Sequence, residues 1–187
     1  MRRYTYYIMA VLTLFTACGD TEYEFNGNYP TFFIFENNAS RSAALASAMN
    51  PMSPGIFCRI TTSGENYYSF TSNQGLSDRV SKTAIDKSRT VILGVYNETG
   101  IMVGYGNLDS PATFYAYDSQ CPNCYKSTNL PRYSLTMNTD GTAACGSCHR
   151  KYDMNNGGLV ISGDKGDKLI RYHASTTGPQ GVLQVSN

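Results

Sequence analysis

Two CxxC pairs, at residues 121–124 and 145–148, constrain this chain more than any other feature of its sequence. Each pair forms a tight turn that directs two sulfurs towards one point, and two such turns at this spacing are typical of metal sites. The resulting tetrahedral all-sulfur cage suits zinc, a single iron or a cysteine-ligated iron–sulfur cluster. The spacing predicts a metal site and leaves its occupant open. The predicted ligands are Cys121, Cys124, Cys145 and Cys148.

The composition favours an all-β domain. Short runs of Tyr, Thr, Val and Ile are separated by Gly, Asn, Asp and Ser, and the chain holds 15 Tyr, 17 Gly and no Trp. The tyrosines suit half-buried strands better than a carbohydrate-binding surface. The formal net charge is +1, and it becomes −1 without Arg2 and Arg3. Such a chain has no basic face, so nucleic acid is excluded as an expected partner.

The first residues are typical of an export signal. Arg2 and Arg3 precede an apolar stretch over residues 6–15, which is shorter than the ~20 residues that span a bilayer. Thr16 and Ala17 then lead to Cys18, as in a bacterial lipobox. We expect cleavage of residues 1–17 and lipidation of Cys18, and therefore a membrane-anchored protein of the bacterial cell envelope. An ordinary signal peptide cleaved elsewhere is the alternative.

Beyond Cys18 the sequence predicts a polar tether at residues 18–29 and a single domain at 30–187. Gly19 does not resemble an inner-membrane retention signal, which favours the outer membrane. An Ala-rich stretch at 39–49 predicts a short helix, and residues 73–90 predict a loop with at most one helical turn. A hairpin is expected from 91–96 and 101–105. The other strands are expected at 31–36, 56–62, 67–72, 113–117, 133–139, 142–144, 159–162, 169–174 and 182–185.

Both cysteine pairs are expected to follow strands. The strand at 113–117 runs into the first pair, and the hairpin at 133–144 ends at the second pair. The two loops would then stand close together on a rigid support, which organises a metal site before the metal binds.

The order of these elements resembles Rieske-type [2Fe–2S] domains over residues 54–187. The residues that carry the resemblance are Phe114 to Asp118 leading into Cys121-Pro122, then Cys145 to Cys148, the Tyr152 to Gly158 segment, the Leu169 to His173 strand and the final strand at 181–185. The resemblance implies an antiparallel β-sandwich or barrel carrying a two-knuckle metal subdomain like that of rubredoxins and zinc ribbons. Cys121 and Cys145 match its cysteine ligands. Asn123 and Cys148 stand where its two histidine ligands would be, so an all-cysteine site is implied.

Three states remain open for the four cysteines. Structural zinc or a single iron would leave no open coordination position, so the domain would serve as a structural or accessory module that binds an unknown protein partner. An all-cysteine [2Fe–2S] cluster would make it an electron-transfer protein. Disulfides, favoured by an oxidising compartment, would leave a structural or thiol-redox role. No catalytic constellation stands out in the sequence. A redox-active CxxC also requires a helix N-terminus, and both pairs are expected in β-rich contexts.

Two further residues have candidate roles. Cys58 lies in an apolar run and is predicted to be a small buried hydrophobe on a strand, with a disulfide to a knuckle cysteine as the alternative. His149 follows Cys148 directly and is either a hydrogen-bond donor to a cysteine sulfur or an exposed residue.

Overall fold

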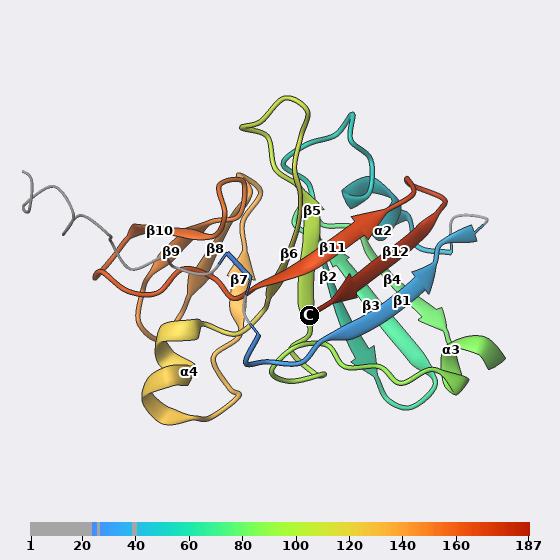
Figure 1. The fold of residues 1–187 in the computed structure, drawn as a ribbon, viewed down its shortest axis with the longest axis horizontal. Coiled ribbons are helices and arrows are strands. Elements are labelled where there is room, and N and C mark those ends of the chain that lie inside the picture. The colour runs from blue at the N-terminus through green and yellow to red at the C-terminus, as the bar shows by residue number, and fades with distance from the viewer. Residues whose placement is uncertain (1–23, 26, 39–40) are drawn as a thin grey trace, which may run out of the picture.

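The chain folds into two antiparallel sheets in a computed structural model that describes residues 24–25, 27–38 and 41–187 (Figure 1). The expected all-β architecture is confirmed. In spatial order, the eight-stranded sheet consists of β1 (Phe32–Glu36), β12 (Val182–Ser186), β11 (Arg171–Thr176), β6 (Phe114–Asp118), β5 (Ile101–Tyr105), β2 (Phe57–Ser63), β3 (Tyr67–Ser72) and β4 (Ser77–Ser81). The four-stranded sheet consists of β10 (Leu159–Ser162), β9 (Lys151–Asp153), β8 (Thr142–Cys145) and β7 (Leu135–Met137).

The large sheet curls around an apolar core, with β1, β11 and β12 in front of β2 and β3 in Figure 1. Alternate side chains of each strand point inwards, and helix α2 (Ala43–Ala48) buries Ala44 and Leu45 against the same core. Ser42 caps this helix by accepting the amide of Leu45. The largest fully buried side chains of the core are Phe33, Phe35, Leu45, Met49, Ile60, Tyr68, Phe70, Leu93 and Tyr172.

One arginine connects the two edge strands of the large sheet. Arg41 donates to the carbonyl of Glu36 in β1 at 3.2 Å and to the carbonyl of Ser81 in β4 at 2.8 Å. The same guanidinium pairs with Asp86 at 3.0 Å and lies 4.6 Å from the centre of the Phe35 ring. A planar group with five donors can make all of these contacts at once. The curl of the sheet is therefore held by side-chain bonds across the gap between β1 and β4.

Residues 73–90 contain a strand that the sequence did not predict. They form β4 and the short helix α3 (Ala84–Ser88), which begins with a capping box between Thr83 and Asp86. β4 is an edge strand in which only Val80 is buried. Its polar composition reflects that position, because an edge strand gains solubility from exposed charges and hydroxyls.

The predicted hairpin between 91–96 and 101–105 is wrong. β5 pairs with β2 and β6, and residues 91–96 bend around the buried carboxylate of Asp118. The amide of Val95 donates to Asp118 at 2.7 Å, and Gly94 lies beside it at φ 70°. A Cβ at Gly94 would lie 2.1 Å from Asp118 Oδ2, so only glycine allows this approach.

Asp118 joins three parts of the fold at the end of β6. Its carboxylate accepts the amides of Val95 and Gln120 at 2.7 Å each and the hydroxyl of Tyr172 at 2.8 Å. Burial raises the pKa of Asp118 to about 6, although these hydrogen bonds oppose the shift. The folded protein therefore binds a proton at pH values where the unfolded chain has lost it.

This raised pKa predicts that stability falls as the pH rises from about 4 to 7. The ordinary value is 3.8, and a separation of about two pH units corresponds to about 3 kcal/mol in the free energy of unfolding. The free energy of unfolding by denaturant should be compared between the wild-type protein and Asp118→Asn at about pH 4 and at about pH 7. The difference between the two proteins isolates Asp118, because both share all other titrating groups. Parallel pH profiles would contradict the assignment.

Candidate metal centre

The first cysteine pair begins a helix. β6 leads through residues 119–120 to Cys121, which is the N-cap of α4 (Pro122–Thr128), and Cys124 lies inside that helix. The amide of Tyr125 donates to the carbonyl of Cys121 at 3.0 Å. Pro122 favours this start because its φ is already helical and it needs no amide partner. The expectation that both pairs lie in β-rich contexts is therefore wrong for this pair, while the preceding strand is as predicted.

The second cysteine pair forms a tight turn between two strands of the small sheet. β8 ends at Cys145, and the chain returns as β9 at Lys151. The amide of His149 donates to the carbonyl of Cys145, and the amide of Cys145 donates to the carbonyl of Arg150, both at 3.0 Å. His149 has a φ of 58°, which gives the turn its left-handed residue. These bonds fix both sulfurs of the pair relative to the sheet.

The four sulfurs converge as the sequence spacing predicts. All four Sγ atoms lie within 4.8 Å of one another. Two separations cross between the pairs, with 3.6 Å from Cys121 to Cys148 and 3.7 Å from Cys124 to Cys145. A tetrahedral ion with metal–sulfur bonds of 2.3 Å requires sulfurs about 3.8 Å apart. The four thiols are unbridged, and their spacing fits a metal ion at the centre.

Burial differs among the four sulfurs. Cys121, Cys124 and Cys145 are buried, whereas Cys148 is partly exposed. Burial raises the pKa of Cys121 and of Cys124, so these thiols ionise only when positive charge is supplied nearby. Burial also acts on Cys148, but hydrogen bonds from the backbone and side chain of Arg150 outweigh it and lower the pKa of Cys148 to about 6. A divalent cation would supply the charge that the buried thiolates need.

A hydroxyl and an amide support the sulfur of Cys121. The hydroxyl of Tyr152 lies 3.2 Å from Cys121 Sγ and accepts a hydrogen bond from Asn123 Nδ2 at 3.0 Å. Because the oxygen accepts from Asn123, its own proton is available to the sulfur. Asn123 also exchanges two bonds with the backbone of Asp167, at 2.8 and 2.9 Å. Asn123 thus links α4, β9 and the loop at 163–168. Both polar atoms of its side chain, Nδ2 and Oδ1, take part in these hydrogen bonds.

Sequence reasoning did not identify Tyr152, Asn123 or Arg150 as parts of this site. The nearest signal was their position, since Asn123 lies within the first pair and Arg150 and Tyr152 follow the second. Their hydrogen bonds depend on how the two knuckles and the loop at 163–168 come together, which a single sequence does not reveal.

The remaining predicted residues lie apart from the sulfurs or outside the described residues. Cys58 is fully buried on β2 and unbridged, as expected of a small buried hydrophobe. His149 is exposed, and its role as a donor to a sulfur stays a prediction. Cys18 and the predicted signal peptide at 1–17 lie outside the described residues. Within the described residues, no helix has the length and apolar character needed to cross a membrane.

Comparison of the chain with models of known families, with curated proteins and with solved structures finds no match. We therefore infer the chemistry of the site from the geometry of its four sulfurs. Four protein sulfurs complete a tetrahedral coordination shell and leave no position for a substrate, so a bound ion here acts as a cross-link or as a redox centre.

The contact between Tyr152 and Cys121 predicts a measurable effect on metal affinity. Tyr152→Phe removes the hydroxyl that donates to the sulfur, and we expect the affinity to fall about ten-fold, as is typical when a partner of a metal ligand is lost. Competition with a chromophoric chelator measures this. Tyr117→Phe is the matched control, because its hydroxyl bonds the carbonyl of Met154 at 3.0 Å in the same core cluster. Equal affinities of the two variants would contradict the role of Tyr152.

Proposed function

We propose that this chain is a lipid-anchored protein of the bacterial cell envelope whose Rieske-like β domain carries one metal ion on four cysteines. The ion is zinc or a single iron, and its role is structural. The observation that supports this proposal most directly is the convergence of four sulfurs at tetrahedral spacing.

The compactness of the sulfur quartet favours one ion over a cluster. In a [2Fe–2S] cluster the thiolates on different irons are separated by the iron–iron axis, which spreads four cysteines into two distinct pairs. Here every Sγ lies within 4.8 Å of every other, and contacts of 3.6 and 3.7 Å cross between the knuckles. Such a set surrounds a point rather than a two-iron axis.

The position of Asn123 also favours an all-cysteine site. In the Rieske resemblance this residue stands where a histidine ligand would be. Its side chain bonds Tyr152 and the backbone of Asp167. The resemblance is supported by the order of the elements, since β6 leads to the first knuckle and β8 to the second. The second knuckle belongs to the small sheet and the first begins α4, so the cysteines join a helix to a sheet beside the larger one.

A structural ion suits an exported protein with unpaired thiols. Thiols in an oxidising compartment form disulfides unless they are bound. A metal held by all four sulfurs protects them and holds α4 to the small sheet. The domain would then act as an accessory module that binds a protein partner, and we propose no catalytic activity.

Electron transfer is the second candidate, favoured by the exposure of Cys148. A [2Fe–2S] cluster would exchange electrons most readily through its one partly exposed ligand. A third possibility is a pair of disulfides, either within each knuckle or across the knuckles, where Cys121 lies 3.6 Å from Cys148 and Cys124 lies 3.7 Å from Cys145.

Metal analysis with a visible spectrum tests the proposal. We expect about one zinc or iron per chain, without the visible bands of an iron–sulfur cluster. Cys145→Ser should lose the ion and several kcal/mol of folding free energy, because metal binding energy is folding energy. Cys58→Ala is the matched control, since it removes a buried thiol away from the site and should keep the ion. Two irons per chain would support the electron-transfer candidate instead, and a metal-free protein with four oxidised cysteines would support the disulfides.

Membrane anchoring has its own test. Cys18→Ala removes the proposed lipidation site, and we expect the variant to lose lipid labelling and to leave the membrane fraction. Cys58→Ala should remain in the membrane fraction. Retention of Cys18→Ala at the membrane would contradict the anchor.

A further inference from the structure

The described residues of the predicted tether lie on the domain. Glu24 forms an ion pair with Arg171 at the start of β11, and the Phe25 ring stacks on His173 with 3.8 Å between ring centres. Four positions after Phe25, the Tyr29 ring meets Tyr125 of α4 edge-on at 5.6 Å. The described residues 24–25 and 27–29 therefore form a strap, with its first contacts on β11 and its last on α4.

Arg171 is the centre of the strap contact. Its guanidinium lies 4.9 Å from the Phe25 ring and 4.6 Å from the Tyr115 ring, so it is sandwiched between the strap and β6. The Arg171 side chain is only 13% exposed, and its Nε is buried with no hydrogen-bond partner. A buried cation needs compensation, and Glu24 supplies the opposite charge while the rings supply π faces. The strap thus supplies the ion-pair partner of Arg171 and one of its two ring contacts.

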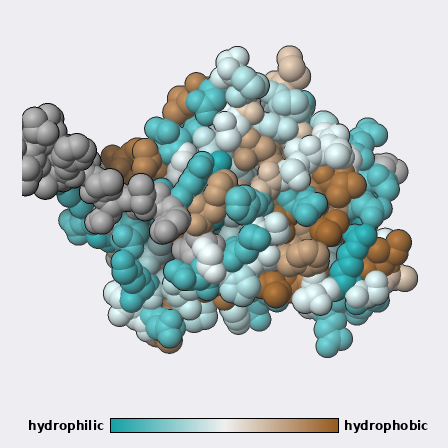
Figure 2. Space-filling model, in the orientation of Figure 1, coloured by the Kyte–Doolittle hydropathy of each residue, from teal (hydrophilic) through white to brown (hydrophobic). Residues whose placement is uncertain are grey.

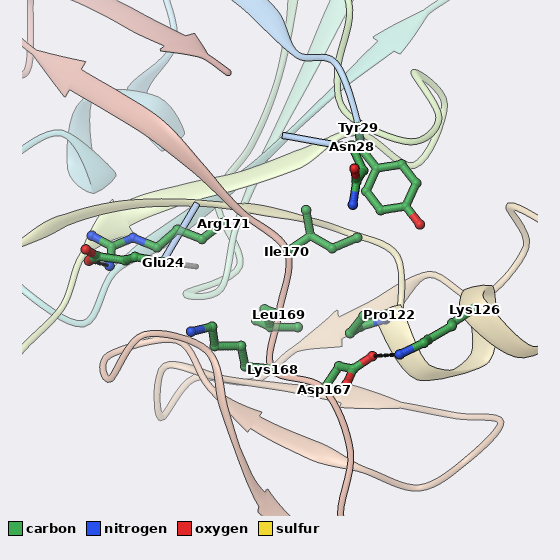
Figure 3. Close-up of a pocket in the computed structure, with 10 residues that line it drawn as sticks. All are labelled: Glu24, Asn28, Tyr29, Pro122, Lys126, Asp167, Lys168, Leu169, Ile170 and Arg171. Atoms are coloured by element: carbon green, nitrogen blue, oxygen red, sulfur yellow. Dashed lines mark hydrogen bonds and ion pairs between the residues drawn. The ribbon is translucent and has the colours of Figure 1, made fainter. Parts of the chain in front are cut away.

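The strap and the helix that carries the first knuckle border the same cavity. A cavity of about 280 Å³ is lined by Glu24 and Tyr29 of the strap, and by Pro122 and Lys126 of α4 (Figure 3). The ion pair between Lys126 and Asp167, 2.8 Å long, closes one side of it. Pro122 follows the ligand Cys121 directly. The start of the strap therefore lies on the same side of the molecule as the first knuckle.

The chain between the proposed lipidation site and the strap is short. Five residues separate Cys18 from Glu24. An extended chain spans at most about 3.5 Å per residue, so Glu24 lies no more than about 20 Å from the lipidated cysteine. This reach is small compared with a domain, and it limits which face of the domain can meet the bilayer.

We propose that the strap orients the domain on the membrane, with the outer face of β11 and β12 against the lipid headgroups and the metal centre beside them. This inference rests on the lipid anchor proposed above. The residues around Phe25 on this face include His173, Ser175, Gln184 and Ser186. They are polar, as suits contact with headgroups rather than insertion into hydrocarbon. In the space-filling view this side is a mixture of polar and small apolar patches (Figure 2).

The absence of tryptophan from the chain makes a direct test possible. Two variants each introduce one tryptophan at an exposed, outward-facing strand position: Ser175→Trp on β11 and Thr71→Trp on β3. β3 lies four places from β11 in the curled sheet and behind it in Figure 1. The full-length lipidated chains are reconstituted in vesicles that contain a dansyl-labelled lipid, and energy transfer from tryptophan to dansyl is measured. We expect several-fold higher transfer from Ser175→Trp than from Thr71→Trp.

A second pair of proteins tests the strap itself. In each of the two probe proteins, the double substitution Glu24→Ser and Phe25→Ser removes the ion pair and the ring contacts of the strap. We expect energy transfer from the two probe positions to become equal, while the proteins still sediment with the vesicles. Equal transfer with the strap intact, in protein that sediments with the vesicles, would overturn the orientation but leave the anchor standing. A difference that persists without the strap contacts would overturn the role of the strap. Failure of the intact protein to carry lipid would overturn both the anchor and the orientation.

Discussion

The stability of the small sheet depends on the interaction that holds the four sulfurs of the metal centre together. Its strands have three or four residues each, and sheets this short gain little stability from their own ladders. Its buried cluster joins Cys121, Cys124 and Cys145 to Tyr152, Leu135 and Met154, and it also includes Phe57, Met102, Tyr115 and Tyr117 of the large sheet. Unlike the core of the large sheet, this cluster contains several thiols. An ion at that point would hold α4, β8 and the loop at 163–168 in one unit, which is how small metal-binding domains make up for a limited core.

The sequence predicted the centre of the site because the constraint there is local. A CxxC turn fixes two sulfurs within four residues, and a strand before each pair brings the turns to one place. The strand β3 was also predictable, since buried residues alternate with more exposed ones over its six positions. In these regions local pattern and global fold agree.

The misassigned segments have different causes, and a long-range contact that overrides the local pattern accounts for one of them. Residues 91–96 are apolar enough for a strand, but they bend around Asp118, a residue more than 20 positions away. The strand β4 is polar because it lies at an edge, and α4 begins where a proline follows a cysteine at the end of an extended segment. The roles of Asn123 and Tyr152 also arise from tertiary contacts. Each residue type is unremarkable by itself, and only the folded chain brings them to the same sulfur.

The uneven burial of the ligands has a consequence for how fast metal is exchanged. Three sulfurs are enclosed, and Cys148 is the only one of the four that solvent reaches to an appreciable extent. An incoming chelator or a donor of metal must therefore begin ligand exchange at Cys148, with Arg150 beside it to attract an anionic competitor. The other three bonds can break only after that side has opened. The lifetime of a bound ion is then governed by the single bond between the metal and the sulfur of Cys148. A site of high affinity can therefore still exchange its ion, because exchange proceeds through this one exposed ligand.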